Sequence, residues 1–251
     1  MQRLRLGDVR SGGLFPSLFA IAVVSVGVVL YLRSNRTFFY DEWDFFLCCR
    51  GWDPTVFFLP HNEHWSTIPI LIWKLLFLVF GIRNYWPYEV VLLVAHVTSA
   101  FLLFLIVQRR LGDLPAYAAA ATVLLLGTGV DNITWAFQIG FVESVALGLL
   151  AIWFIDTEWR LQISIPAISA ALLVSLMCSS VGLAFVVAVG AMLFLDSQRR
   201  MLLPALIVPT AALWSGSSDS TQERLQDRPA LRRSSGTGQA VGPTSWASPN
   251  S

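Results

Sequence analysis

The chain has 251 residues, of which 55% are hydrophobic and 13% are charged, and its mean hydropathy is +0.64. Soluble domains contain about 25% charged and about 45–50% apolar residues, so the composition excludes an ordinary soluble fold and predicts an integral membrane protein. A net charge of +1 leaves no basic face for a nucleic acid, and three cysteines are too few for a zinc site or a disulfide framework.

The first apolar segment, residues 14–32, follows a short N-terminus that contains Arg3, Arg5 and Arg10. It is longer than a signal-peptide core and no small-x-small cleavage site follows it, so we interpret it as a retained anchor. A bilayer core of about 30 Å needs about 20 helical residues, or somewhat fewer where helix ends snorkel. Later segments that we expect to span are residues 86–107, 114–128, 139–155, 161–177, 181–195 and, incompletely, 201–214. The sequence therefore predicts an all-α, polytopic transmembrane domain over residues 14–214 with about seven spans.

A long loop, residues 33–85, separates the first two expected spans and contains the apolar segment 68–80. That segment is about 20 Å of helix and carries Lys74, so we expect an interfacial or re-entrant helix. If it does not cross, the cations outside the loop fall on one side of the bilayer. These cations are Arg3, Arg5, Arg10, Arg109, Arg110, Arg160, Arg199 and Arg200. The positive-inside rule makes that side, with residues 1–13, the cytoplasm of a multi-pass plasma membrane protein, and makes the loop extracytoplasmic.

Residues 215–251 change abruptly to Ser, Gly, Pro, Gln, Arg and Asp, and this composition predicts a disordered tail because it buries little apolar surface. The change arrives inside an apolar run where a seventh span should continue. We therefore expect a truncated or frame-shifted end.

The loop opens with residues 38–46, in which the carboxylates Asp41, Glu42 and Asp44 alternate with aromatic residues. Aromatic side chains suit the headgroup region. On a helix Asp41 and Asp44 would share a face, and repulsion between crowded carboxylates would prepare one of them as a general base. A solvated acidic loop explains the same residues equally well.

A second cluster, His61, Asn62, Glu63 and His64, precedes the apolar segment 68–80. On a helix the two histidines would point the same way and could bind a phosphate, or a divalent metal together with Glu63 or a first-cluster carboxylate. Their spacing does not match the i,i+4 zinc-protease pattern, and histidines lying among headgroups are the alternative. The sequence requires no cofactor, and it leaves a divalent metal open.

A third group, residues 131–138, lies in a short loop on the same expected side and contains the candidate ligand-binding residues Asn132 and Gln138. Glu143 follows inside the next span, and Glu89 and His96 lie in an earlier one. Intramembrane ionisable residues usually face a cavity or a partner. A buried contact between helices would satisfy Glu143 as well.

The combination of one span, a long outer loop with residues 40–44 (YDEWD) and then residues 61–64 (HNEH) resembles the GT-C glycosyltransferase superfamily. More narrowly, it is similar to multi-span proteins of actinobacterial type that are grouped with that superfamily. Residues 135–141 (WAFQIGF) and 178–185 (CSSVGLAF) also look familiar from those bacterial proteins. The resemblance covers residues 1–214 and implies a sugar donor on a polyprenyl phosphate, with a catalytic base at Asp41 or Glu42.

The preferred hypothesis is sugar transfer at the outer face of the bilayer, with an acidic residue of the first cluster as base. Arg36, His61 or His64 would stabilise the leaving phosphate by charge-assisted hydrogen bonds. A transporter is the first alternative, although its spans would need polar or helix-breaking residues near mid-membrane. A non-catalytic or truncated membrane subunit is the second. The expected partners are the bilayer and a polyprenyl-phosphate-linked sugar, and no nucleic acid.

Overall fold

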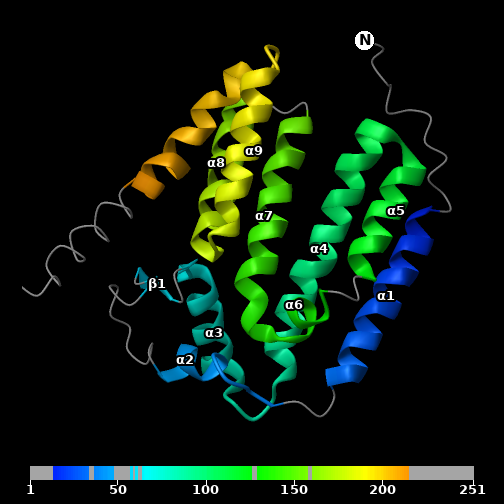
Figure 1. Ribbon diagram of the computed structural model, residues 1–251, viewed down its shortest axis with the longest axis vertical. Helices are drawn as coiled ribbons and strands as arrows, with labels where there is room; N and C mark the ends of the chain where they lie inside the picture. Colours follow the sequence, from blue (N-terminus) through cyan, green and yellow to red (C-terminus); the bar gives the residue numbers. More distant parts are fainter. Residues whose placement is uncertain are drawn as a thin grey trace, which may run out of the picture. The chain divides into compact units, whose positions relative to one another are not determined.

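A computed structural model of the protein describes residues 14–33, 37–47, 57–58, 60–61, 64–125, 129–157 and 160–214 (Figure 1). The chain divides into a unit of Met1–Leu213 and a unit of Trp214–Ser251, and the description below concerns the first unit. The expected cytoplasmic segment 1–13 and the expected disordered tail 215–251 lie outside the described residues.

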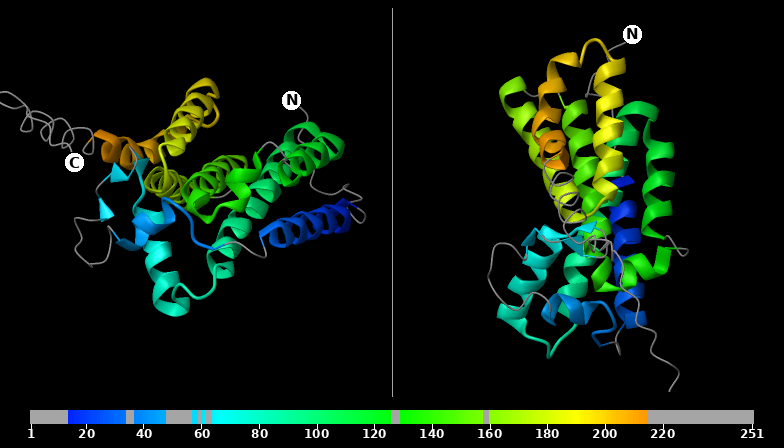
Figure 2. Two further views of the ribbon diagram at one scale, coloured as in Figure 1. Left: turned by 60° about the horizontal axis from the view of Figure 1, so that its bottom comes forward. Right: turned by 60° about the vertical axis from the view of Figure 1, so that its left-hand side comes forward.

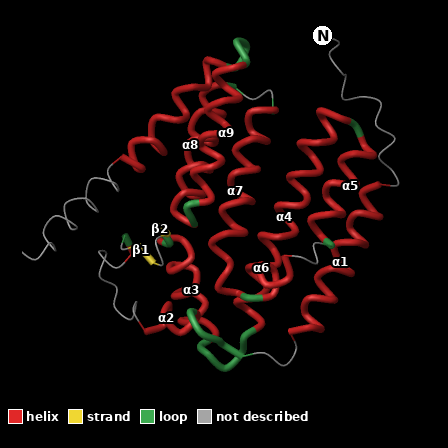
Figure 3. The backbone as a smooth tube through the Cα atoms, in the orientation of Figure 1, coloured by secondary structure: helices red, strands yellow, loops and turns green. Residues whose placement is uncertain are grey.

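The fold is helical, as the composition predicts. In chain order its helices are α1 (Leu14–Arg33), α2 (Glu42–Leu47), α3 (Thr67–Phe80), α4 (Trp86–Leu111), α5 (Asp113–Leu124), α6 (Val130–Thr134), η3 (Ala136–Gln138), α7 (Ile139–Asp156), α8 (Leu161–Cys178), α9 (Val181–Leu195) and η4 (Arg200–Leu206). Two short strands, β1 (Pro60–His61) and β2 (His64–Trp65), form an antiparallel pair in which His61 lies opposite His64 (Figure 3). The two histidines therefore belong to a strand pair, and the shared helical face considered from their spacing does not form.

Three described helical segments are long and apolar enough to cross a membrane: Trp86–Leu111, Ala136–Asp156 and Leu161–Cys178. They begin and end within a few residues of three expected spans, and they support the prediction of a membrane protein. Residues 16–32, 67–80, 181–195 and 200–214 form shorter apolar helices. Helix α5 has 12 residues, about 18 Å of helix. The total of seven spans and the interfacial placement of α3 stay predictions.

Helix α7 is the central element of the unit. It packs against α4 on one side and against α8 and α9 on the other, while α5 packs against α4 and α1 against α5 (Figures 1 and 2). Alanines at the buried face of α5, Ala116 and Ala120, lie against Phe104 of α4 and Leu18 of α1. Small residues at such interfaces let helix backbones approach closely, which suits helices in a bilayer.

Two buried serines join α7 to α8. The Ser144 hydroxyl donates to the Ser175 carbonyl oxygen at 2.9 Å, and the Ser175 hydroxyl donates to the Ser144 carbonyl oxygen at 2.8 Å. Both residues are completely buried. The reciprocal pair therefore fixes the register of the two helices with polar contacts rather than with apolar packing alone.

Ion pairs gather the C-terminal ends of several helices at one end of the unit. Asp156, the last residue of α7, contacts Arg110 of α4 at 2.9 Å and Arg199, which follows α9, at 2.6 Å. Helices α2, α3 and α6 and the strand pair lie at the opposite end (Figure 1). The structure thus separates an end with cationic helix termini from an end that carries the long loop.

Candidate functional site

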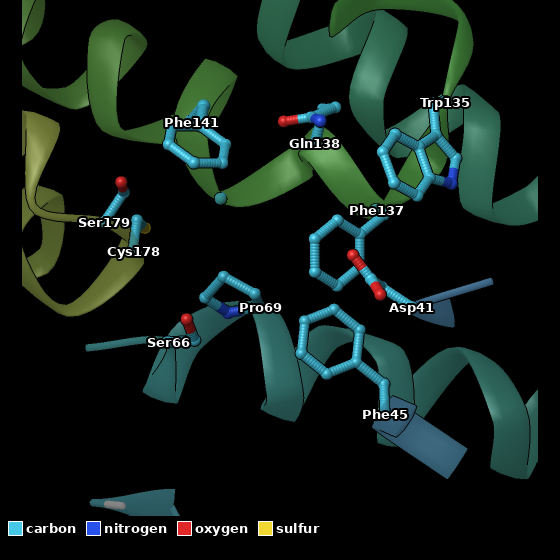
Figure 4. Close-up of a pocket in the computed structure, with 11 residues that line it drawn as sticks. Asp41, Phe45, Ser66, Pro69, Trp135, Phe137, Gln138, Phe141, Cys178 and Ser179 are labelled. Carbon is cyan, nitrogen blue, oxygen red and sulfur yellow. The ribbon is translucent and has the colours of Figure 1, made fainter. Parts of the chain in front are cut away.

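A pocket of about 250 Å³ lies at the end that carries the long loop (Figure 4). Four segments that are distant in the sequence meet there: the turn into α2, the start of α3, the stretch from η3 into α7, and the end of α8. The lining residues are Asp41, Phe45, Ser66, Pro69, Trp135, Phe137, Gln138, Gly140, Phe141, Cys178 and Ser179. The acidic cluster therefore meets both of the later motifs, residues 135–141 and 178–185, in one place.

The close approach of α7 to α8 at this pocket depends on Gly140. A Cβ atom at that position would lie 2.7 Å from the Cys178 carbonyl oxygen and 2.9 Å from Cγ of Pro69. Contacts that short essentially do not occur, so a larger residue would push the first turn of α7 away from its neighbours. Glycine at position 140 lets α3, α7 and α8 meet around the pocket.

Stacked aromatic rings form one wall. Phe45 stacks on Phe137 with ring centroids 5.0 Å apart, and Phe137 stacks on Trp135 at 5.1 Å. The indole N–H of Trp135 is buried and has no hydrogen-bond partner among the described residues. The column therefore offers an apolar surface, and Trp135 adds an unused donor.

The structure separates the three carboxylates of the first cluster. Asp41 is half-buried and lines the pocket, Glu42 is completely buried, and Asp44 is exposed and is not among the lining residues. The amide of Asp44 donates to the Asp41 carbonyl at 3.1 Å, so the two residues lie one turn apart along the backbone. Of the three, Asp41 alone can meet a ligand in this pocket.

Glu42 accepts hydrogen bonds from two chain segments. The Tyr85 hydroxyl donates to Glu42 Oε1 at 2.5 Å, and the Phe39 amide donates to Glu42 Oε2 at 2.7 Å. The Tyr85 oxygen also accepts the Ala136 amide at 2.9 Å. Nothing in the sequence distinguishes Tyr85 from the other aromatic residues of the expected membrane interface, and only the fold reveals its role.

The backbone is strained beside Asp41. Tyr40 has a φ of 48°, in the left-handed region that residues other than glycine rarely adopt. The turn around it is closed by the Glu42 amide, which donates to the Phe39 carbonyl at 3.2 Å, and by the Trp43 amide, which donates to the Tyr40 carbonyl at 3.1 Å. This conformation sets the direction in which Asp41 leaves the chain.

Glu143 makes a contact between helices next to the pocket. The Cys178 thiol donates to Glu143 Oε2 at 3.9 Å, which links α7 to the end of α8. Glu143 is not among the lining residues, whereas Cys178 is. This contact is the kind of helix-to-helix satisfaction that the sequence left open for Glu143.

Other candidate residues lie away from the pocket or outside the described structure. Asn132 is exposed on α6, whereas Gln138 lines the pocket. Glu89 and His96 lie on the buried face of α4, and neither lines the pocket. Arg36, Asn62 and Glu63 lie outside the described residues, and for His61, His64 and Asp131 only the backbone is described.

Metal binding was left open by the sequence. Among the residues that the structure describes, no group of three or more His, Cys, Asp and Glu side chains could hold a metal ion. The second cluster, on which the metal hypothesis depended, falls on side chains outside that description.

No protein-family model, curated protein or solved structure matches this chain. The likeness to GT-C glycosyltransferases stays a prediction from the motifs, and a functional assignment depends on the residues of the pocket.

Proposed function

We propose that this chain transfers a sugar from a polyprenyl phosphate at the extracytoplasmic face of the membrane, with Asp41 as the general base. The observation that carries the proposal is the placement of Asp41. It is the carboxylate of the first cluster that lines the pocket, whereas Glu42 is enclosed by hydrogen bonds and Asp44 is exposed.

The proposed reaction needs one base close to the acceptor. The acceptor hydroxyl gives its proton to the Asp41 carboxylate, and its oxygen forms a bond with the anomeric carbon of the donor sugar. The bond from that carbon to the lipid phosphate oxygen breaks, and the phosphate leaves with the electron pair. A positioned base contributes about 10²- to 10⁴-fold to such a rate.

The composition of the pocket supports a ligand that has both an apolar face and hydroxyl groups. The rings of Phe45, Phe137 and Trp135 provide the stacking surface. Ser66, Gln138 and Ser179 add polar groups to the lining. Ligand sites commonly combine a mostly apolar lining with a few polar groups that fix orientation. At about 250 Å³ the pocket is smaller than the ~300–1,000 Å³ typical of drug-sized ligands, which suits a single sugar unit.

Backbone strain next to the proposed base agrees with a functional site. Residues held in sparsely populated backbone regions cost about 1–3 kcal/mol each and cluster at active sites, where the surroundings maintain them. Tyr40 is such a residue and directly precedes Asp41.

The test is a transfer assay with the chain reconstituted in vesicles that contain polyprenyl-phosphate sugars and a hydroxyl acceptor. We expect Asp41→Asn to lower transfer by at least about 10²-fold, the low end for a lost base, with membrane insertion unchanged. Asp44→Asn is the matched control, because it neutralises an exposed carboxylate three residues away and should change transfer little. Undiminished transfer by Asp41→Asn would overturn the proposal. Binding of the lipid without any transfer would favour a non-catalytic subunit.

A further inference from the structure

The hydrogen bonds around Glu42 connect the two sides of the pocket that carry the base and the aromatic column. We infer that Glu42 and Tyr85 are positioning residues: together they form a clamp that holds Asp41 at a fixed place relative to Trp135 and Phe137. The catalytic consequence of this clamp rests on the proposed function, whereas its mechanical consequence does not.

On the side of the base, Glu42 closes the turn that presents Asp41. Its side chain accepts the Phe39 amide, while its own amide donates to the Phe39 carbonyl. This reciprocal pattern, over a spacing of three residues, is the arrangement of a helix capping box. A strained residue persists only where its surroundings over-determine it, and the turn closed by Glu42 contains the strained Tyr40.

On the aromatic side, Tyr85 fixes the start of η3. The amide of Ala136 is at the first position of a helical turn, where amides have no partner within the helix, and it donates to the Tyr85 oxygen instead. Ala136 lies between Trp135 and Phe137 in the chain. The Tyr85 hydroxyl is therefore a bridge that donates toward the base and accepts from the column.

The clamp is also connected to Cys178 through α7. Four residues after Ala136, the backbone of Gly140 packs directly against the Cys178 carbonyl. Cys178 is 1% exposed and lines the pocket. Release of Ala136 should therefore loosen the first turn of α7 and open a path to the Cys178 thiol.

Thiol labelling of the intact chain measures this opening without any assumption about activity. In a Cys48→Ser/Cys49→Ser background Cys178 is the remaining cysteine, and N-ethylmaleimide reacts with it when the pocket opens. We expect Tyr85→Phe, which keeps the ring and removes the bridging hydroxyl, to speed labelling about tenfold. That change corresponds to about 1.4 kcal/mol in the opening equilibrium, within the range for a buried group that loses its partner.

Two further variants control for general loosening. Glu42→Gln leaves one carbonyl oxygen for two donors and should speed labelling less than Tyr85→Phe does. Ser25→Ala removes a buried hydrogen bond to the Leu124 carbonyl, between α1 and α5, and should leave labelling of Cys178 unchanged. Labelling that is unchanged in both Tyr85→Phe and Glu42→Gln, or equally fast in Ser25→Ala, would overturn the clamp.

The transfer assay tests the positioning role. A displaced base should lower kcat per folded protein by about 10- to 100-fold and leave KM nearly unchanged, because acceptor binding is kept while its alignment is lost. Faster labelling of Tyr85→Phe with an unchanged kcat would show that the clamp does not position the base. If the unsubstituted chain transfers no sugar, the proposed function fails, and labelling alone still decides whether the clamp exists.

Discussion

At the scale of single residues, the pocket depends on side-chain directions that a sequence pattern does not contain. Asp41, Glu42 and Asp44 share one charge type within four positions, and residue type alone marks them as candidates. Their separation into a pocket residue, a buried residue and an exposed residue follows from the left-handed backbone of Tyr40 and from hydrogen bonds to Tyr85 and Phe39. Those partners are nonlocal or conformational, so the sequence could not choose between Asp41 and Glu42.

The effect of Gly140→Ala is predictable at the same scale. The added methyl group would lie 2.7 Å from the Cys178 carbonyl oxygen, and a backbone atom cannot turn away as a flexible side chain can. We expect a loss of about 1–3 kcal/mol in the free energy of unfolding, as in other overpacked sites. Denaturant unfolding in detergent micelles measures it. Gly27→Ala is the control, because a Cβ there meets nothing within 4 Å and alanine is the better helix former.

At the scale of elements, hydropathy predicted the long apolar helices well. The helices α4, α7 and α8 begin at the expected residues and end within four residues of the expected ends, because length and apolar composition are local properties. The expected span 114–128 is described as a helix only to Leu124, a short alanine-rich element that packs on α4 and α1. The pairing of β1 with β2 was missed because two-residue strands leave no periodic pattern.

The serine pair between α7 and α8 makes a measurable contribution to the stability of those elements. Ser144→Ala or Ser175→Ala should each lower the free energy of unfolding by about 0.6 kcal/mol and at most about 1.7 kcal/mol, the range for polar contacts between membrane helices. The double variant should lose less than the sum, because the two hydroxyls also contact each other at 3.0 Å. Thr122→Ala is the control, since its exposed hydroxyl bonds within its own helix to Ala118. A fully additive double variant would show that the serines act independently.

At the scale of the whole described unit, charge and chemistry occupy opposite ends. The Asp156 ion pairs with Arg110 and Arg199 mark one end, and the pocket marks the other. The sequence placed these arginines together from the positive-inside rule. It could not show that residues 41, 66, 135 and 178 meet, because contacts between segments that are distant in the chain depend on how the helices pack.

This separation predicts which positions a membrane-impermeant thiol reagent reaches in intact cells. We use a background with Cys48→Ser, Cys49→Ser and Cys178→Ala. Asn84→Cys lies in the exposed connection between α3 and α4, at the pocket end, and should be labelled in intact cells. Gln198→Cys lies in the exposed turn after α9, beside the Asp156 ion pairs, and should be labelled only after the membrane is permeabilised. The physical reason is the cost of moving cationic loops across the bilayer, which retains the arginine-rich end in the cytoplasm. Labelling of both positions from outside would contradict a membrane-spanning arrangement between the two ends. A reversed pattern would keep the spans, and would place the pocket and its proposed lipid-linked donor on the cytoplasmic side.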